Sequence, residues 1–253
     1  MSKLWFCKIA ALVMCLNVVV VPTKAAETLV AVAANFAAPA EALADAFTKA
    51  TGYSTKYSFG ATGQLYTQIT QGAPFEIFLA ADNVHPARIE AEGLAVPGSR
   101  FAYSVGRLAL WSADPEMIDE RGEVLKSGHF NRLAIPNPET APYGAAAVEV
   151  LKALGVFEMV QPKIVQGSNI TQTHQFVATG NAQLGFVALA QIIMNDDGSR
   201  WVVPDDLHAP LIQDAVLLKK GEANEAALAY LSFLRSSEAL AIIRRYGYRA
   251  AGS

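Results

Sequence analysis

The chain has 253 residues, of which 52% are hydrophobic, and its formal net charge is −3. A chain of this length and composition can bury one large core or two smaller ones without disulfide bonds. Because it is acidic and has no Lys/Arg cluster larger than a pair such as Arg244–Arg245, it lacks the basic surface of a nucleic-acid-binding protein, and we expect no nucleic-acid partner.

Residues 1–25 have the features of a cleavable secretory signal peptide. Lys3 and Lys8 form a positively charged start, an apolar stretch follows at residues 9–21, and small residues near position 25 suit cleavage. An uncleaved membrane anchor is the alternative, but the apolar stretch is short for a membrane span and is interrupted by Asn17. We therefore expect export to the periplasm.

Removal of this segment changes the properties of the mature chain. Both cysteines, Cys7 and Cys15, lie within it, so the mature protein is expected to contain no thiol and no disulfide. Its three lysines are also lost without any acidic residue, which takes the net charge from −3 to −6. The fold must then be stabilised by its core alone.

The mature sequence begins with alternating strand and helix patterns. Residues 28–34 form a continuous apolar run, which is typical of a strand buried on both faces. Apolar residues then recur at helical spacing from Leu43 until Gly52 ends the helix. A strand at 53–59, a helix at 62–71 and a strand at 75–80 continue the alternation, which predicts a parallel sheet covered by helices.

A second set of such units follows. Strands are predicted at 108–111, 133–135 and 163–166, with helices at 142–154 and from 169 onward. A late strand at 213–218 precedes two helices at 222–234 and 238–246, and Ser236 or Ser237 can cap the last one. We expect two α/β lobes, one formed by residues 26–106 and 213–253 and the other by residues 107–212.

Four loops share one character, because each follows a strand and begins a helix. They lie at residues 33–35, 60–63, 141–144 and 167–170. Ligands bind at the carboxyl ends of strands in open α/β sheets, and helix starts offer unpaired N–H groups to anions. Thr62 adds a hydroxyl and Asn35 an amide NH₂, while Pro142 leaves the Tyr143 amide as the first outward donor of its helix.

These loops contain no Lys, Arg or His, and the nearest acid in sequence is Glu139. A bound anion would therefore be held by N–H and O–H dipoles rather than by ion pairs. A proton-bearing anion would also need an acceptor, which only an inward-facing Glu139 could provide, so a fully ionised oxyanion fits best. Ordinary helix capping is the alternative explanation of such small and polar residues.

At these residues the chain resembles the periplasmic molybdate-binding proteins of ABC transporters. The likeness covers nearly the whole mature chain, from residue 28 to 248, and includes "VAVAANF", "FGATGQLYTQITQGAPFEIFLAAD", "NPETAPYGAAAVEVLKALG", "LGFVALAQI" and "SSEALAIIRRYGY". It implies a type II periplasmic binding protein, with two α/β lobes joined by two hinge strands and molybdate or tungstate in the cleft. It also implies delivery to a permease in the inner membrane, and we expect a monomer without a cofactor.

The resemblance assigns ligand-binding roles to five positions, namely Ala34, Asn35, Thr62, Tyr143 and Ile170. Thr62 is expected to contribute its hydroxyl and amide, and Ala34, Tyr143 and Ile170 their backbone groups. The chain departs from relatives that carry hydroxyl side chains at Ala34–Asn35, and from those with a ligand tyrosine at Ala188. We expect these departures to affect the selectivity among anions but not the class of anion that is bound.

Two other functions remain open from the sequence. The chain could bind sulfate or another oxyanion, or it could be a secreted hydrolase of an anionic substrate with Asp82 as an acid. Asp82 also suits a cap or turn, and Ser168 lacks an evident base, so we expect no enzyme. No metal cation site is predicted, because the four histidines lack zinc-site spacing; they are His85, His129, His174 and His208.

Overall fold

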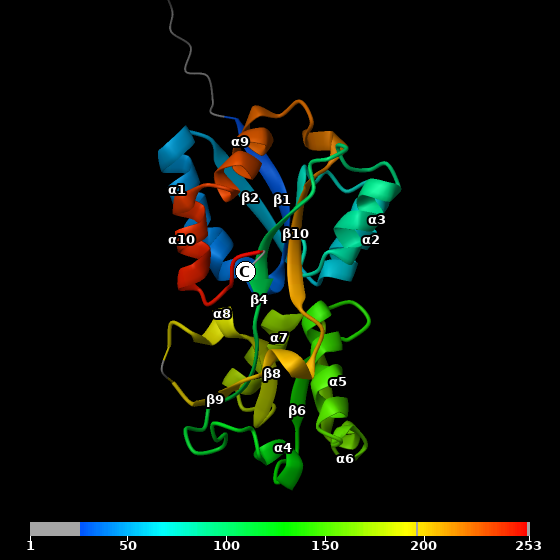
Figure 1. The fold of residues 1–253 in the computed structure, drawn as a ribbon, viewed down its shortest axis with the longest axis vertical. Helices are drawn as coiled ribbons and strands as arrows, with labels where there is room; N and C mark the ends of the chain where they lie inside the picture. The colour runs from blue at the N-terminus through cyan, green and yellow to red at the C-terminus, as the bar shows by residue number, and fades with distance from the viewer. Residues whose placement is uncertain (1–25, 196, 252–253) are drawn as a thin grey trace, which may run out of the picture.

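The computed structural model describes residues 26–195 and 197–251, so the predicted signal peptide lies outside the described residues. Two α/β lobes are stacked along the long axis of the molecule, each built around its own five-stranded sheet (Figure 1). In the part of the chain that is described, no single helix is long and apolar enough to cross a membrane; the last two helices pass that test only as a pair bent by 65°.

The first lobe contains a sheet with strand order β2-β1-β3-β10-β4. Its strands are β1 (Glu27–Ala33), β2 (Ser54–Gly60), β3 (Ile77–Leu79), β4 (Phe101–Gly106) and β10 (Leu211–Leu217). Its helices are α1 (Ala37–Thr51), α2 (Thr62–Thr70), α3 (Val84–Ala91), α9 (Glu225–Leu234) and α10 (Ser237–Arg245), with the 3-10 turns η1 (Ala34–Phe36) and η4 (Lys219–Gly221).

The second lobe contains a sheet with strand order β7-β6-β8-β5-β9. Its strands are β5 (Leu108–Ser112), β6 (Leu133–Pro136), β7 (Ile164–Gly167), β8 (Leu184–Ala188) and β9 (Ser199–Val202). Its helices are α4 (Val124–Ser127), α5 (Pro142–Ala153), α6 (Phe157–Val160), α7 (Ile170–Ala178) and α8 (Leu189–Ile192), with the 3-10 turns η2 (Gln161–Lys163) and η3 (Asp205–Leu207).

Local sequence signals explain most of these elements. In α1, Leu43 and Phe47 are fully buried on the stripe that the helical spacing predicts, and Phe47 packs edge-on against Tyr230 at 5.1 Å. Gly52 ends the helix with a φ of 77°, a conformation that glycine adopts without a Cβ penalty. Ser236 caps α10 by accepting a hydrogen bond from the Ala239 N–H at 3.1 Å.

The sheets are mixed, whereas the alternating pattern predicted a parallel sheet. β1 pairs in parallel with β2 and β3, but β10 runs antiparallel to β3 and β4. The reason is connectivity, because β4 leaves the first lobe toward the second and β10 returns from it (Figure 1). β5 is likewise antiparallel to β8 and β9.

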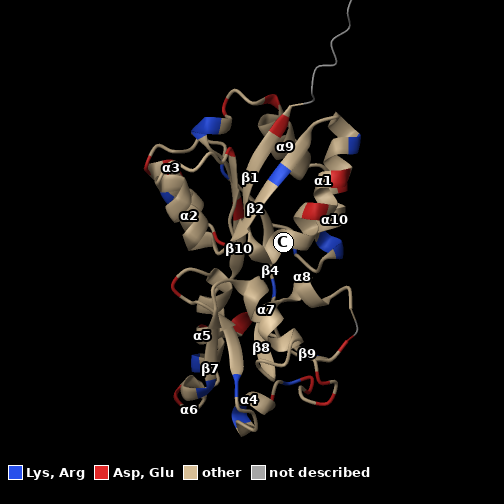
Figure 2. Ribbon diagram, turned by 180° about the vertical axis from the view of Figure 1, so that it is seen from behind, with Lys and Arg blue, Asp and Glu red and all other residues tan. Residues whose placement is uncertain are grey.

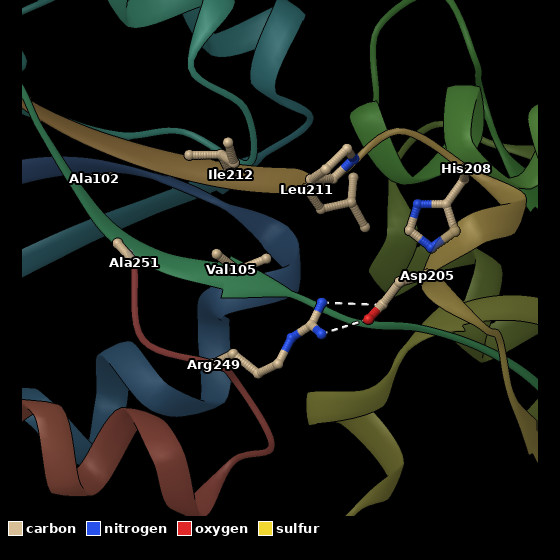
Figure 3. Close-up of a pocket in the computed structure, with 9 residues that line it drawn as sticks. Ala102, Val105, Asp205, His208, Leu211, Ile212, Arg249 and Ala251 are labelled. Carbon is tan, nitrogen blue, oxygen red and sulfur yellow. Dashed lines mark hydrogen bonds and ion pairs between the residues drawn. The ribbon is translucent and has the colours of Figure 1, made fainter. Parts of the chain in front are cut away.

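Two crossing segments join the lobes. Arg107 alone separates β4 from β5, and residues 203–210 connect β9 to β10. Beside them, Arg249 of the C-terminal segment forms a two-bond ion pair with Asp205 of η3, next to an open groove of about 420 Å³ (Figure 3). The fold class is the one predicted, whereas the exact lobe boundaries stay a prediction.

Candidate functional site

The four predicted loops come together in one small cavity between the lobes. Its walls include all five residues that the sequence analysis selected, namely Ala34, Asn35, Thr62, Tyr143 and Ile170. The first three belong to the first lobe, and the last two lie in the first turns of α5 and α7 in the second lobe. The cavity measures about 10 Å³ and is therefore much smaller than the groove at the hinge, which measures about 420 Å³.

Three of the helical starts at this cavity have no side-chain cap. The residues before η1, α2 and α5 are Ala33, Ala61 and Ala141, and alanine offers no oxygen to the first-turn N–H groups. The first four N–H groups of a helix have no acceptor within the helix itself, and these starts are buried. Only α7 is capped conventionally, by Asn169 Oδ1, which accepts from the Gln172 N–H at 3.0 Å.

The hydroxyl of Thr62 accepts one hydrogen bond within the protein and keeps its proton for another. Its side-chain oxygen accepts a hydrogen bond from the Ala81 N–H at 3.0 Å, and the residue is only 1% exposed. Because that bond uses the oxygen as an acceptor, the hydroxyl proton remains available for a guest in the cavity. The donor role that the sequence suggested for Thr62 stays a prediction.

The side chain of Asn35 is engaged differently from what we expected. Its NH₂ group donates to Gln213 Oε1 at 3.1 Å and to Tyr248 Oη at 3.0 Å, and the backbone carbonyl oxygen of Asn35 accepts from that same hydroxyl at 2.7 Å. Both amide protons are thereby directed into the protein rather than toward the cavity. What Asn35 retains for a guest is its backbone N–H, in the first turn of η1.

The described residues that line the cavity carry no charged side chain. Among the described residues, its walls contain no Lys, Arg, His, Asp or Glu, and Figure 2 shows the charged residues mainly on the outer helices and loops of the lobes. Asp82 follows the lining residue Ala81, but its carboxylate accepts from the His85 N–H at 3.0 Å and lies 2.7 Å from His85 Nδ1. It serves as a cap, and Glu139 is exposed to solvent.

A backbone hydrogen bond links the two lobes at the rim of the cavity. The Gly63 N–H, in the first turn of α2, donates to the carbonyl of Thr140 at 2.8 Å. A Cβ at Gly63 would lie 3.2 Å from both Thr140 Cα and Thr140 O, so glycine permits this close approach. The contact joins the two lobes beside the cavity, and no pattern in the sequence indicated it.

Three of the four histidines make structural contacts. His85 pairs with Asp82, and His174 stacks on Trp111 with ring centroids 4.7 Å apart. The Nδ1 of His208 lies 2.7 Å from the Ala209 carbonyl. Within the described ranges, no group of three or more His, Cys, Asp or Glu side chains could hold a metal ion.

Comparisons with known proteins agree with this architecture. The family described as "Bacterial extracellular solute-binding protein" matches residues 28–249. The chain belongs to this family. It is therefore a solute-binding component of a transport system and not an enzyme, which sets aside the hydrolase alternative.

Two individual relatives and one solved structure are named as molybdate-binding proteins. The chain is 55% identical to the molybdate-binding protein ModA of Rhodobacter capsulatus, an alignment that covers 90% of each chain. It is 54% identical to ModA of Azotobacter vinelandii, over 89% of this chain and 90% of the relative. The solved structure of the A. vinelandii periplasmic molybdate-binding protein superposes with a TM-score of 0.86 at 39% identity, covering 88% of this chain and 99% of that one.

The same fold also occurs in a protein named for binding a different anion, sulfate. The sulfate-binding protein SubI of Mycobacterium tuberculosis has a TM-score of 0.73 at 13% identity, covering 90% of this chain and 88% of that one. At such low identity the likeness concerns the fold alone.

Proposed function

We propose that this protein captures molybdate, and also tungstate, between its two lobes and delivers the anion to the permease of an ABC transporter in the inner membrane. The observation that carries the proposal is a small, uncharged cavity between the lobes, lined by uncapped helix starts from both of them. The names of the relatives at 55% and 54% identity supply the chemical identity of the guest.

In this proposal the anion is bound almost entirely by backbone donors. The N–H groups of Ala34, Asn35, Tyr143 and Ile170 are directed to its oxygens, and Thr62 contributes both its N–H and its hydroxyl. Hydrogen bonds to an ionised acceptor are roughly twice as strong as neutral ones, so such a set can replace the hydration shell of the anion without a cation. The positive ends of α2, α5 and α7 add to the attraction.

The donor-only lining also selects among anions by their protonation. Hydrogen phosphate carries a proton that needs an acceptor, and Glu139 is exposed rather than directed inward. Molybdate, tungstate and sulfate carry no proton at neutral pH and differ mainly in size.

We further propose that the mature protein acts as a periplasmic monomer. The predicted signal peptide at residues 1–25 would direct export and then be removed. The hydrogen-bond donors are divided between the two lobes, so the anion is fully bound only when the lobes are closed. Binding of the anion therefore shifts an equilibrium between open and closed forms.

An isothermal titration series with molybdate, tungstate, sulfate and phosphate tests the proposal. We expect tight binding of molybdate and tungstate, weaker binding of sulfate, and no heat from phosphate. Strongest binding of sulfate would reassign the ligand while keeping the donor-only site. Binding of phosphate as tight as that of molybdate would contradict the argument from protonation.

A further inference from the structure

A buried polar cluster lies beneath the anion cavity and joins it to the hinge. Its members come from both lobes and from the crossing strands; they are Asn35, Tyr103, Tyr143, Gln213 and Tyr248. None of the five is more than 4% exposed, so these groups are satisfied by one another rather than by solvent. Burial raises the pKa of Tyr103, Tyr143 and Tyr248, so the phenols stay protonated and act as neutral hydrogen-bonding groups.

Gln213 is the centre of this cluster. Its side-chain oxygen accepts from Asn35 Nδ2 at 3.1 Å and from Tyr103 Oη at 3.0 Å, and its Nε2 donates to Tyr143 Oη at 3.2 Å. Gln213 lies on β10, the strand that returns from the second lobe to the first. One fully buried amide on the hinge therefore contacts the side chains of two residues whose backbones line the anion cavity.

Tyr143 is the member whose side chain reaches from the second lobe to the first. It lies in the first turn of α5, whose neighbours include β6 and β8 of the second sheet, yet its hydroxyl reaches Gln213 in the first sheet. Gly106, at the end of the other crossing strand, leaves room for this approach. A Cβ there would lie 2.1 Å from Tyr143 Oη and 2.5 Å from Gln213 Nε2.

From this geometry we propose that Tyr143 is a positioning residue whose phenol hydroxyl latches the lobes closed through Gln213 and slows release of the bound anion. When the lobes separate, the hydroxyl leaves Gln213, and a buried amide N–H loses its acceptor. The latch keeps the backbone N–H of Tyr143 opposite that of Asn35, so that donors from both lobes stay on the same guest. The inference rests on the proposed function for the identity of the guest but not for the latch itself.

The Tyr143→Phe variant removes only the latching oxygen and keeps the backbone donor. We expect the dissociation rate constant for molybdate, measured by release of labelled molybdate into excess unlabelled anion, to rise about tenfold while the association rate constant changes less than about twofold. The matched control is Tyr230→Phe, which removes a fully buried hydroxyl that lies 3.1 Å from Tyr57 Oη within the first lobe. The control should leave both rate constants unchanged.

A second measurement needs no ligand. The Gly63 amide is protected by its bond to Thr140 of the opposite lobe, so its hydrogen exchange reports lobe opening. In the anion-free protein, Tyr143→Phe should speed exchange of this amide about tenfold, whereas Tyr230→Phe should not. Gly106→Ala should act like Tyr143→Phe, because its methyl group would displace the same hydroxyl.

The outcomes separate the two proposals. Exchange at Gly63 within about twofold of the wild type in Tyr143→Phe would overturn the latch, as would an equal effect of Tyr230→Phe. Failure of the wild type to bind molybdate would overturn the proposed function, and the exchange measurement would still decide the latch.

Discussion

The hydroxyl of Thr62 gives the sharpest test of the proposed anion site, because it makes one hydrogen bond within the protein and a second, proposed one to the anion. It accepts from the Ala81 N–H at 3.0 Å, and in our proposal it donates its proton to the anion. Thr62→Ala removes both bonds, whereas Thr62→Ser keeps the hydroxyl and removes only a methyl group. The pair of variants therefore separates loss of the donor from a general disturbance of α2.

The expected magnitudes follow from the two bonds separately. Loss of one charge-assisted hydrogen bond should weaken molybdate binding by about 1.5–3 kcal/mol, which raises Kd about 10- to 150-fold. Loss of the acceptor leaves the Ala81 N–H unpaired at a residue only 2% exposed, which should lower the free energy of unfolding of the anion-free protein by about 1–3 kcal/mol. Thr62→Ser should stay close to the wild type in both quantities.

Calorimetric titration gives the first quantity, and chemical denaturation without anion gives the second. If Thr62→Ala binds molybdate within about twofold of the wild type, Thr62 does not donate to the anion and the site assignment is wrong at this position. A large loss of stability with unchanged affinity would assign the hydroxyl to Ala81 alone.

Three further predictions concern charge and pH. Molybdate affinity should change little between low and high NaCl concentrations in titrations, because no charged side chain lines the cavity among the described residues. Arg100→Ala should lower the unfolding free energy by about 1–2 kcal/mol in denaturant melts, because it leaves the Asp214 carboxylate, 4% exposed and 2.7 Å from Arg100, without its partner; an unchanged melt would contradict that role. Burial lowers the pKa of His174, so the unfolded state binds the proton more readily. Stability should therefore fall as the pH drops below the ordinary histidine pKa of about 6.5, and His174→Gln should show a smaller fall over the same range.

Local patterns were sufficient to predict most elements that carry the site. The spacing of Leu43 and Phe47 and the position of Gly52 define α1, because a helix in a small lobe must bury one stripe and end where a left-handed residue is available. β4 was missed, since "FAYSVG" mixes polar and apolar residues without regular alternation. Its burial comes from β10, a partner more than 100 residues away along the chain.

The role of Asn35 could not be predicted from its neighbours in sequence. Its amide is a good anion donor by chemistry, yet it bonds to Gln213 and Tyr248, which lie 178 and 213 residues farther along the chain. Gln213 itself was visible only as a polar residue within an apolar strand. No local rule indicates which distant groups such a residue will meet.

The sequence by itself determined the neutral character of the anion site, since four uncharged helix starts follow strands whose ends must meet at the edge of a sheet. The tertiary structure alone decided how the two halves of the site are held together. The Gly63–Thr140 and Tyr143–Gln213 bonds join the two lobes, and the second connects residues 70 positions apart. The physical reason is that hydrogen-bond donors and acceptors are local properties of residues, whereas their partners depend on which surfaces the fold brings into contact.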